Sequence, residues 1–114
     1  MQHLVFVYGS LRKNEVNHYF LQKSELLGLF ETQPQYALYD FGTVPGLVDG
    51  HSAIVGEVYR ITDSVLAQLD AFEDVPIEYK RETIETTFGE AWIYIYQGTE
   101  PGKAIESGDW NLRN

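Results

Sequence analysis

The chain has 114 residues, of which 44% are hydrophobic, and this length suits one domain with one hydrophobic core, so we expect a single domain over 1–114. Its 17 acidic residues outnumber its 8 basic residues, and the net charge of −9 argues against nucleic acid or an anionic membrane surface as a partner. The absence of cysteine excludes disulfides, a thiol nucleophile and thiolate metal sites.

The predicted elements are mostly strands. The first covers 3–8, which is almost wholly apolar and therefore typical of a strand buried on both faces. A short helix is expected over 15–22, and Val44-Pro45-Gly46 has the composition of a turn. Further strands are predicted at 26–30, 36–39, 54–61, 79–86 and 91–96, with a hairpin turn at 87–90.

A second helix is predicted over 62–72. Thr62 is a suitable N-cap, and Ile61 and Leu66 occupy the positions of a hydrophobic staple. The apolar side chains then form one stripe: Val65, Leu66, Leu69 and Phe72. Six strands and two short helices in mixed order indicate an α+β protein whose sheet curls around its own core.

No stretch of the sequence approaches the ~20 apolar residues of a membrane span, and the chain starts in a strand-like segment rather than in a leader. We therefore expect a cytoplasmic protein without a membrane partner. His3, His18 and His51 do not have the spacing of metal ligands, so no metal site is expected.

The tetrapeptide Tyr8-Gly9-Ser10-Leu11 follows the first strand directly. Glycine lacks a Cβ, so a turn at this place exposes backbone N–H groups that can bind an anion or a carboxylate. This turn is the first candidate binding site, and Arg81 is a second candidate donor in an otherwise acidic chain.

Glu73 stands where the stripe of the second helix calls for another apolar residue, seven positions after Leu66. If the helix extends this far, partial burial, the negative end of the helix dipole and the charges of Asp70 and Asp74 raise the pKa of its carboxyl. Such a group suits proton transfer near neutral pH. A solvated carboxylate at a fraying helix end is the alternative. Glu57 is a second candidate: it either acts as a base or supports one from nearby, or else it pairs with an arginine or faces water.

Three segments together resemble the gamma-glutamyl cyclotransferase-like family. They are Tyr8-Gly9-Ser10-Leu11, Gly56-Glu57-Val58-Tyr59, and Leu69-Asp70-Ala71-Phe72-Glu73-Asp74 followed by Tyr79-Lys80-Arg81. The resemblance covers nearly the whole chain and is greatest to small bacterial members and to gamma-glutamylamine cyclotransferases. It implies a mixed β-barrel of about six strands with short flanking helices, and a pocket at the end of the first strand.

The resemblance also implies an activity. Family members release 5-oxoproline from gamma-glutamyl compounds when the substrate's own α-amine attacks its γ-carbonyl, without a cofactor. The catalytic glutamate of the family corresponds to Glu73 and its substrate-binding loop to residues 8–11. Tyr79 and Arg81 are further candidates for substrate binding, although Arg81 can equally pair with Asp70, Asp74 or Glu82.

Some features leave alternatives open. Many family members have glycine after the catalytic glutamate, where this chain has Asp74, and the connector 75–78 is short, so the pocket rim can differ. A binding module that holds a carboxylate-bearing metabolite without cleaving it is one alternative, and an interaction domain is another.

Tyr8, Tyr79 and Tyr96 either line the pocket or belong to the core. We expect a monomer or a weak homodimer, with Trp110 either fastening the C-terminal segment or serving a dimer contact.

Overall fold

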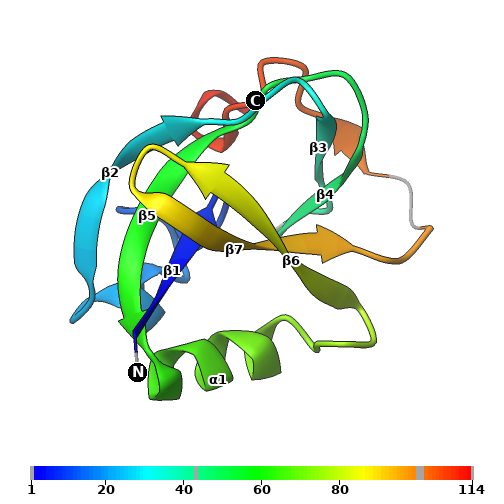
Figure 1. Cartoon of the computed structure of the whole chain (residues 1–114). Coiled ribbons are helices and arrows are strands. Elements are labelled where there is room, and N and C mark those ends of the chain that lie inside the picture. The colour runs from blue at the N-terminus through cyan, green and yellow to red at the C-terminus, as the bar shows by residue number, and fades with distance from the viewer. Residues whose placement is uncertain (1, 43, 100–101, 114) are drawn as a thin grey trace.

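The computed structural model describes residues 2–42, 44–99 and 102–113. Within these residues there are eight strands, one α-helix and two 3₁₀-helices (Figure 1). The helices are η1 (His18–Leu21), α1 (Asp63–Phe72) and η2 (Trp110–Leu112). The strands are β1 (Gln2–Val7), β2 (Glu25–Glu31), β3 (Tyr36–Asp40), β4 (Pro45–Asp49), β5 (Val55–Thr62), β6 (Tyr79–Thr86), β7 (Gly89–Tyr96) and β8 (Lys103–Ala104).

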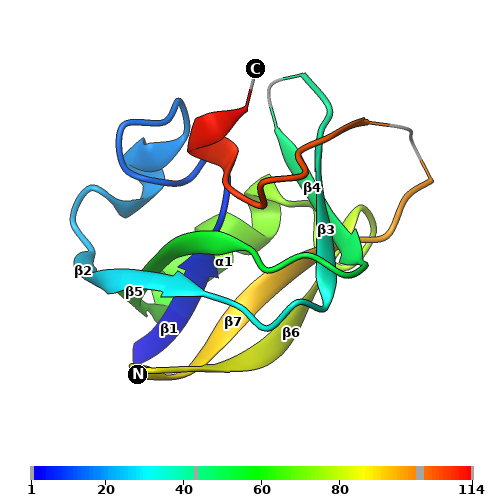
Figure 2. The same ribbon diagram turned by 90° about the horizontal axis from the view of Figure 1, so that it is seen from above.

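The strands form two sheets. The larger has the order β2-β5-β1-β7-β6, in which only β1 and β7 are parallel. The smaller has the order β4-β3-β8 and lies beside one end of the larger sheet (Figures 1 and 2). The expected α+β class is therefore confirmed, whereas one closed barrel of about six strands is not, because the described strands are divided between two sheets.

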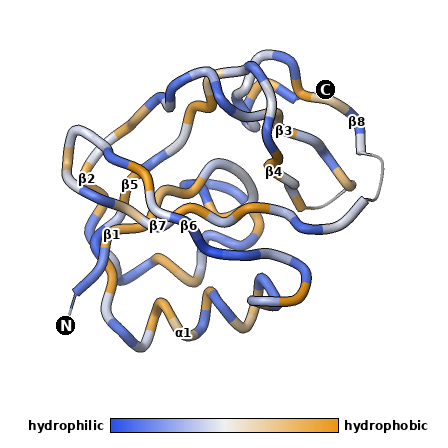
Figure 3. The backbone as a smooth tube through the Cα atoms, turned by 45° about the vertical axis from the view of Figure 1, so that its right-hand side comes forward, coloured by the Kyte–Doolittle hydropathy of each residue, from blue (hydrophilic) through white to orange (hydrophobic). Residues whose placement is uncertain are grey.

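Two hydrophobic clusters cover opposite faces of β1. Phe6 and Tyr8 belong to a cluster that includes residues of the smaller sheet and Trp110, whereas Val5 and Val7 belong to a cluster with Leu66 and Leu69 of α1. This arrangement explains why the first strand is apolar on both sides. Figure 3 shows the matching pattern in α1, where hydrophobic and hydrophilic residues alternate around the helix.

The predicted strands lie within two residues of the observed ones. Two predicted elements differ: the helix expected over 15–22 is only the 3₁₀-helix η1, and the turn expected at Val44-Pro45-Gly46 runs into β4. Pro45 is the first residue of that strand, a position at which the missing N–H of proline is tolerated. Trp110 is fully buried in the cluster that includes the smaller sheet, which confirms that it fastens the C-terminal segment.

Helix α1 has a well-formed start and end. The Thr62 hydroxyl accepts from the Val65 N–H, as predicted for the N-cap. At the other end, the Val75 N–H donates to the Asp70 carbonyl and the Asp74 N–H donates to the Ala71 carbonyl, which together form a Schellman motif. Asp74 has φ +54°, the left-handed conformation that this motif requires. Asp74, which stands where the resemblance leads us to expect glycine, is a residue that tolerates this conformation.

No helix in the described part of the chain is long and apolar enough to cross a membrane.

Candidate active site

Glu73 and the turn after β1 line the same narrow pocket. Residues 8–11 form one wall, and Glu73 approaches from the end of α1. Further lining residues come from β1, β4 and β7: Phe6, Val7, Pro45 and Tyr94. The candidate proton carrier and the candidate substrate-binding turn are therefore brought together, although Glu73 comes 62 positions after Leu11 in the sequence.

Glu73 is the C-cap residue of α1, and its backbone N–H donates to the Leu69 carbonyl over 2.9 Å. The Schellman motif holds this last turn closed, so the carboxyl does not belong to a fraying helix end. Its side chain is half-buried and makes no hydrogen bond or ion pair with any residue that the structure describes. A carboxyl in this state is available to a ligand in the pocket.

Burial raises the pKa of the Glu73 carboxyl from its ordinary 4.5 to about 8, and the negative charge of Glu78 adds to the rise. The expected direction of the shift is confirmed, but its charge partner differs from the prediction. Neither Asp70 nor Asp74, the two predicted charge partners, is a cause of the shift, and the Asp70 carboxylate lies against Arg81 and Tyr94. The like charge that acts on Glu73 comes instead from Glu78, at the end of the short connector to β6.

The turn presents three consecutive backbone donors. Within the described residues, the N–H groups of Gly9, Ser10 and Leu11 donate to no other protein atom. The Arg12 N–H donates to the Gly9 carbonyl over 2.9 Å and closes the turn. The Ser10 hydroxyl is buried and accepts from the Asn17 side chain over 2.9 Å. The amides of this turn are thus the free donors of the pocket, as expected for a site that binds a carboxylate or an oxyanion.

Gly9 is required by a close approach rather than by its backbone conformation. A Cβ at this position would lie 2.1 Å from Cγ of Pro45, which is inside any van der Waals contact. Pro45 begins β4, so the absence of a side chain at Gly9 lets the smaller sheet close over the turn.

The tyrosines predicted near the pocket have different places. Tyr8 is buried and its hydroxyl donates to the Tyr94 carbonyl over 2.6 Å, while burial and the charge of Glu73 raise the pKa of this hydroxyl. The Tyr79 hydroxyl donates to the Pro45 carbonyl, which fastens β6 to β4 beside the pocket. Tyr96 packs against Tyr79 and Phe41 and does not line the pocket.

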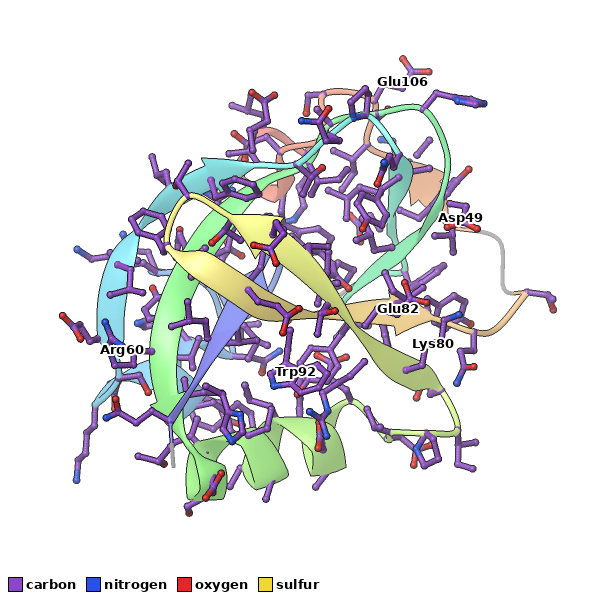
Figure 4. The ribbon with its side chains drawn as sticks, viewed as in Figure 1. Asp49, Arg60, Lys80, Glu82, Trp92 and Glu106 are labelled. Atoms are coloured by element: carbon purple, nitrogen blue, oxygen red, sulfur yellow. The ribbon has the colours of Figure 1, made fainter. Side chains whose placement is uncertain are left out.

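Arg81 lies outside the pocket. Its Nε is 2.9 Å from an oxygen of Asp70, without the alignment of a hydrogen bond, and its guanidinium stacks on the Trp92 ring at 4.2 Å from the centroid. Trp92, labelled in Figure 4, packs against the cluster that α1 covers. Arg81 was predicted either to bind substrate or to pair with an acidic residue, and in the structure it pairs with Asp70.

Glu57 is buried away from the pocket. Its carboxylate accepts from Arg12, from the Lys13 N–H and from the Tyr59 hydroxyl, each over 2.9 Å. The interpretation of Glu57 as the partner of an arginine is therefore confirmed.

Sequence reasoning missed Tyr94 as a residue of the site. Tyr94 lines the pocket, and its hydroxyl donates to Asp70 over 2.8 Å. The alternation of aromatic residues in the last strand marks one face of β7, but nothing in the sequence separates Tyr94 from Tyr96. Within the described part of the chain, no three His, Asp or Glu side chains are grouped so that they could hold a metal ion.

Comparison with known proteins places the chain in one family. The family described as "Gamma-glutamyl cyclotransferase, AIG2-like" matches residues 5–112. A protein of Vibrio cholerae serotype O1, provisionally named as a gamma-glutamylcyclotransferase, is 64% identical over 114 residues, which cover 99% of each chain. The family protein YtfP of Escherichia coli K12 is 47% identical over 107 residues, covering 93% of this chain and 94% of its own.

Solved structures agree with this assignment. The solution structure of the Escherichia coli protein has a TM-score of 0.78 at 45% identity and covers 94% of this chain and 95% of its own. A crystal structure of a Pyrococcus horikoshii protein has a TM-score of 0.83 at 29% identity, with 96% and 90% covered. The chain belongs to the gamma-glutamyl cyclotransferase family.

Proposed function

We propose that residues 1–114 act as one gamma-glutamyl cyclotransferase domain that releases 5-oxoproline from a small gamma-glutamyl amine or peptide. The observation that carries the proposal is that one pocket brings together the Glu73 carboxyl and three amides, none of which has a hydrogen-bond partner among the described residues. A base and an anion-binding turn are the two groups that this cyclisation needs.

The first step is proton transfer. The substrate's α-ammonium gives a proton to the Glu73 carboxylate, and the free amine attacks the γ-carbonyl carbon. Burial raises the pKa of Glu73 toward that of an amine, so its carboxylate is a stronger base for this transfer than an ordinary glutamate.

The second step breaks the amide bond. The attack closes a five-membered ring and places negative charge on the carbonyl oxygen, and the C–N bond to the leaving amine then breaks as the carbonyl re-forms. Glu73 returns its proton to that nitrogen, and the ring nitrogen gives up its extra proton to the released amine, which leaves as an ammonium ion, so the protein ends in its starting state. Because the reaction is intramolecular, the pocket has to hold the folded conformer of the substrate, and orientation alone can remove several kcal/mol of the barrier.

The amides of Gly9, Ser10 and Leu11 supply the anion site in this scheme. They bind either the substrate's α-carboxylate or the oxygen that becomes negative during the attack. The loss of one such donor typically costs about 100-fold or more in rate. Their position on a short turn at the end of β1 supports this role, because the buried strand limits their movement.

Incubation with a panel of gamma-glutamyl amines, dipeptides and peptides, followed by measurement of 5-oxoproline, tests the proposal. We expect turnover of at least one compound by the wild type and none by Glu73→Gln. Glu31→Gln, at an exposed position on β2, is the matched control and retains activity. Equal activity of wild type and Glu73→Gln would remove Glu73 from the mechanism. Thermal stabilisation by the same compounds without any product would instead favour the binding module.

We also propose Tyr79 and Arg81 as residues that bind the substrate. Arg81 would have to leave Asp70 in order to reach a substrate carboxylate, so its side chain needs to reorient. Arg81→Lys tests this: loss of a bidentate contact raises KM by about tenfold or more, whereas a purely structural role lowers stability and leaves KM unchanged.

A further inference from the structure

Glu57 holds both ends of the turn that carries the free amides. In the pairing of β1 with β5, Glu57 stands opposite Val7, the last residue of β1. Its side chain extends past the turn, where one oxygen accepts from Arg12 Nε and the other from the Lys13 N–H, both over 2.9 Å. Residues 8–11 therefore lie between the strand pairing at Val7 and the side-chain bonds to Arg12 and Lys13.

The attachment is buried and well bonded. Arg12 is 4% exposed and Glu57 is 5% exposed. The Tyr59 hydroxyl also donates to Glu57, and a second guanidinium nitrogen of Arg12 donates to Asp109 over 2.7 Å. Asp109 caps η2, so the C-terminal segment is part of the same network. Hydrogen bonds of charged groups strengthen when water is excluded, so this network restricts movement of the chain around Arg12.

The network does not touch the pocket itself, because neither Glu57 nor Arg12 is among its lining residues. A buried ion pair is also weak evidence for stability, since apolar residues of similar volume often serve as well. The directional hydrogen bonds of this ion pair instead fix the backbone conformation of the segment that they hold. Here that chain is the turn with the Gly9, Ser10 and Leu11 amides.

We propose that Glu57 is a positioning residue, which fixes the direction of the three amides by holding Arg12 and the Lys13 N–H. This proposal rests on the proposed function, because it assigns the amides to the substrate's carboxylate or oxyanion. Glu57 contacts no reacting atom and acts only through the turn.

Glu57→Gln tests the proposal. The amide has the same shape, but its NH₂ group has to face either Arg12 Nε or the Lys13 N–H, both of which are donors. We expect kcat/KM to fall by about 10- to 100-fold, as for a small misplacement of binding groups. The pH dependence of the remaining activity stays that of the wild type, because Glu73 is unchanged. Glu25→Gln is the control. Glu25 lies on β2 and forms an exposed ion pair with Arg60, which is labelled in Figure 4 and lies on β5, the strand of Glu57.

Backbone ¹⁵N order parameters provide a measurement that does not depend on activity. We expect values near 0.85 at residues 9–11 in the wild type and below about 0.6 in Glu57→Gln, with no change in the β6–β7 hairpin. Arg12→Lys, which cannot hold Glu57 and Asp109 together, has the same effect and replaces Glu57→Gln if that variant fails to fold.

The outcomes separate the two proposals. Unchanged order parameters at residues 9–11, or an equal loss of order over the whole sheet, would overturn the positioning role. A loss of order confined to the turn, together with reduced kcat/KM and an unchanged pH profile, supports it. If the wild type cleaves no gamma-glutamyl compound, the proposed function fails, and the order parameters still decide whether Glu57 holds the turn.

Discussion

The Tyr94 hydroxyl donates to the Asp70 carboxylate over 2.8 Å, which joins a wall of the pocket to the helix that ends in Glu73. Asp70 also lies 2.9 Å from Arg81 Nε, so one carboxylate connects α1, β6 and β7. Burial and the hydrogen bond to Asp70 raise the pKa of the Tyr94 hydroxyl, which therefore stays protonated and continues to donate. This connection keeps Asp70 occupied while Glu73 has no partner among the described residues.

Tyr94→Phe is expected to lower the free energy of unfolding by about 1–2 kcal/mol, because it removes one hydrogen bond to a charged group. Urea unfolding measures the change. Tyr39→Phe is the control, since the Tyr39 hydroxyl bonds to no described residue, and it should stay within about 0.5 kcal/mol of the wild type. If both variants lose the same stability, the bond to Asp70 is not what holds this wall.

The pH dependence of kcat/KM follows from Glu73. Its carboxyl has to be ionised to accept a proton, so kcat/KM rises with pH through a midpoint near 8. Removal of the charge of Glu78 in Glu78→Gln lowers the pKa of Glu73 and moves this midpoint to lower pH. Rates over pH 5–10 with one substrate provide the measurement, and a midpoint that stays in place would exclude Glu78 as the group that acts on Glu73.

Gly9→Ala is expected to disrupt the pocket, because the new Cβ meets Pro45 at 2.1 Å. Overpacking of this kind typically costs about 1–3 kcal/mol of stability, and displacement of the turn should reduce kcat/KM by about 100-fold.

The pair Gly9→Ala/Pro45→Ala tests the cause of this loss. Pro45→Ala removes Cγ, the nearest atom, and Cδ, and leaves Cβ of residue 45 at 2.8 Å from the new Cβ. The double variant therefore recovers part of both losses, and a double-mutant cycle measures the coupling. Strictly additive effects would show that Gly9 is needed for a reason other than this contact.

Asp74→Gly is expected to raise the free energy of unfolding by about 0.5–1 kcal/mol. Glycine adopts the left-handed conformation at φ +54° without the steric cost that a Cβ carries, which outweighs its greater freedom in the unfolded chain. Thermal unfolding compares this variant with Asp74→Ala, which keeps the Cβ and should be less stable than the wild type. A less stable glycine variant would show that the Asp74 side chain contributes to this turn.

Local patterns made much of the fold predictable. Helix α1 could be recognised from its N-cap and its apolar stripe, because both depend on residues three or four positions apart. The same periodicity marked Glu73 as a polar residue at a core-facing position. The strands could be located from their composition, and β1 could be recognised as buried on both faces.

Only the tertiary structure decided which of these pieces meet. The order β2-β5-β1-β7-β6 brings the end of β1 to the end of α1, and the separate sheet of β4, β3 and β8 covers the turn at Gly9. The pairing of Arg12 with Glu57 and the burial that raises the pKa of Glu73 also depend on this packing. Patterns in the sequence reflect interactions between residues that are near one another along the chain. Contacts between residues 45 positions apart or more form when whole helices and strands pack together and exclude water. The local spacing of residues does not predict which elements pack together.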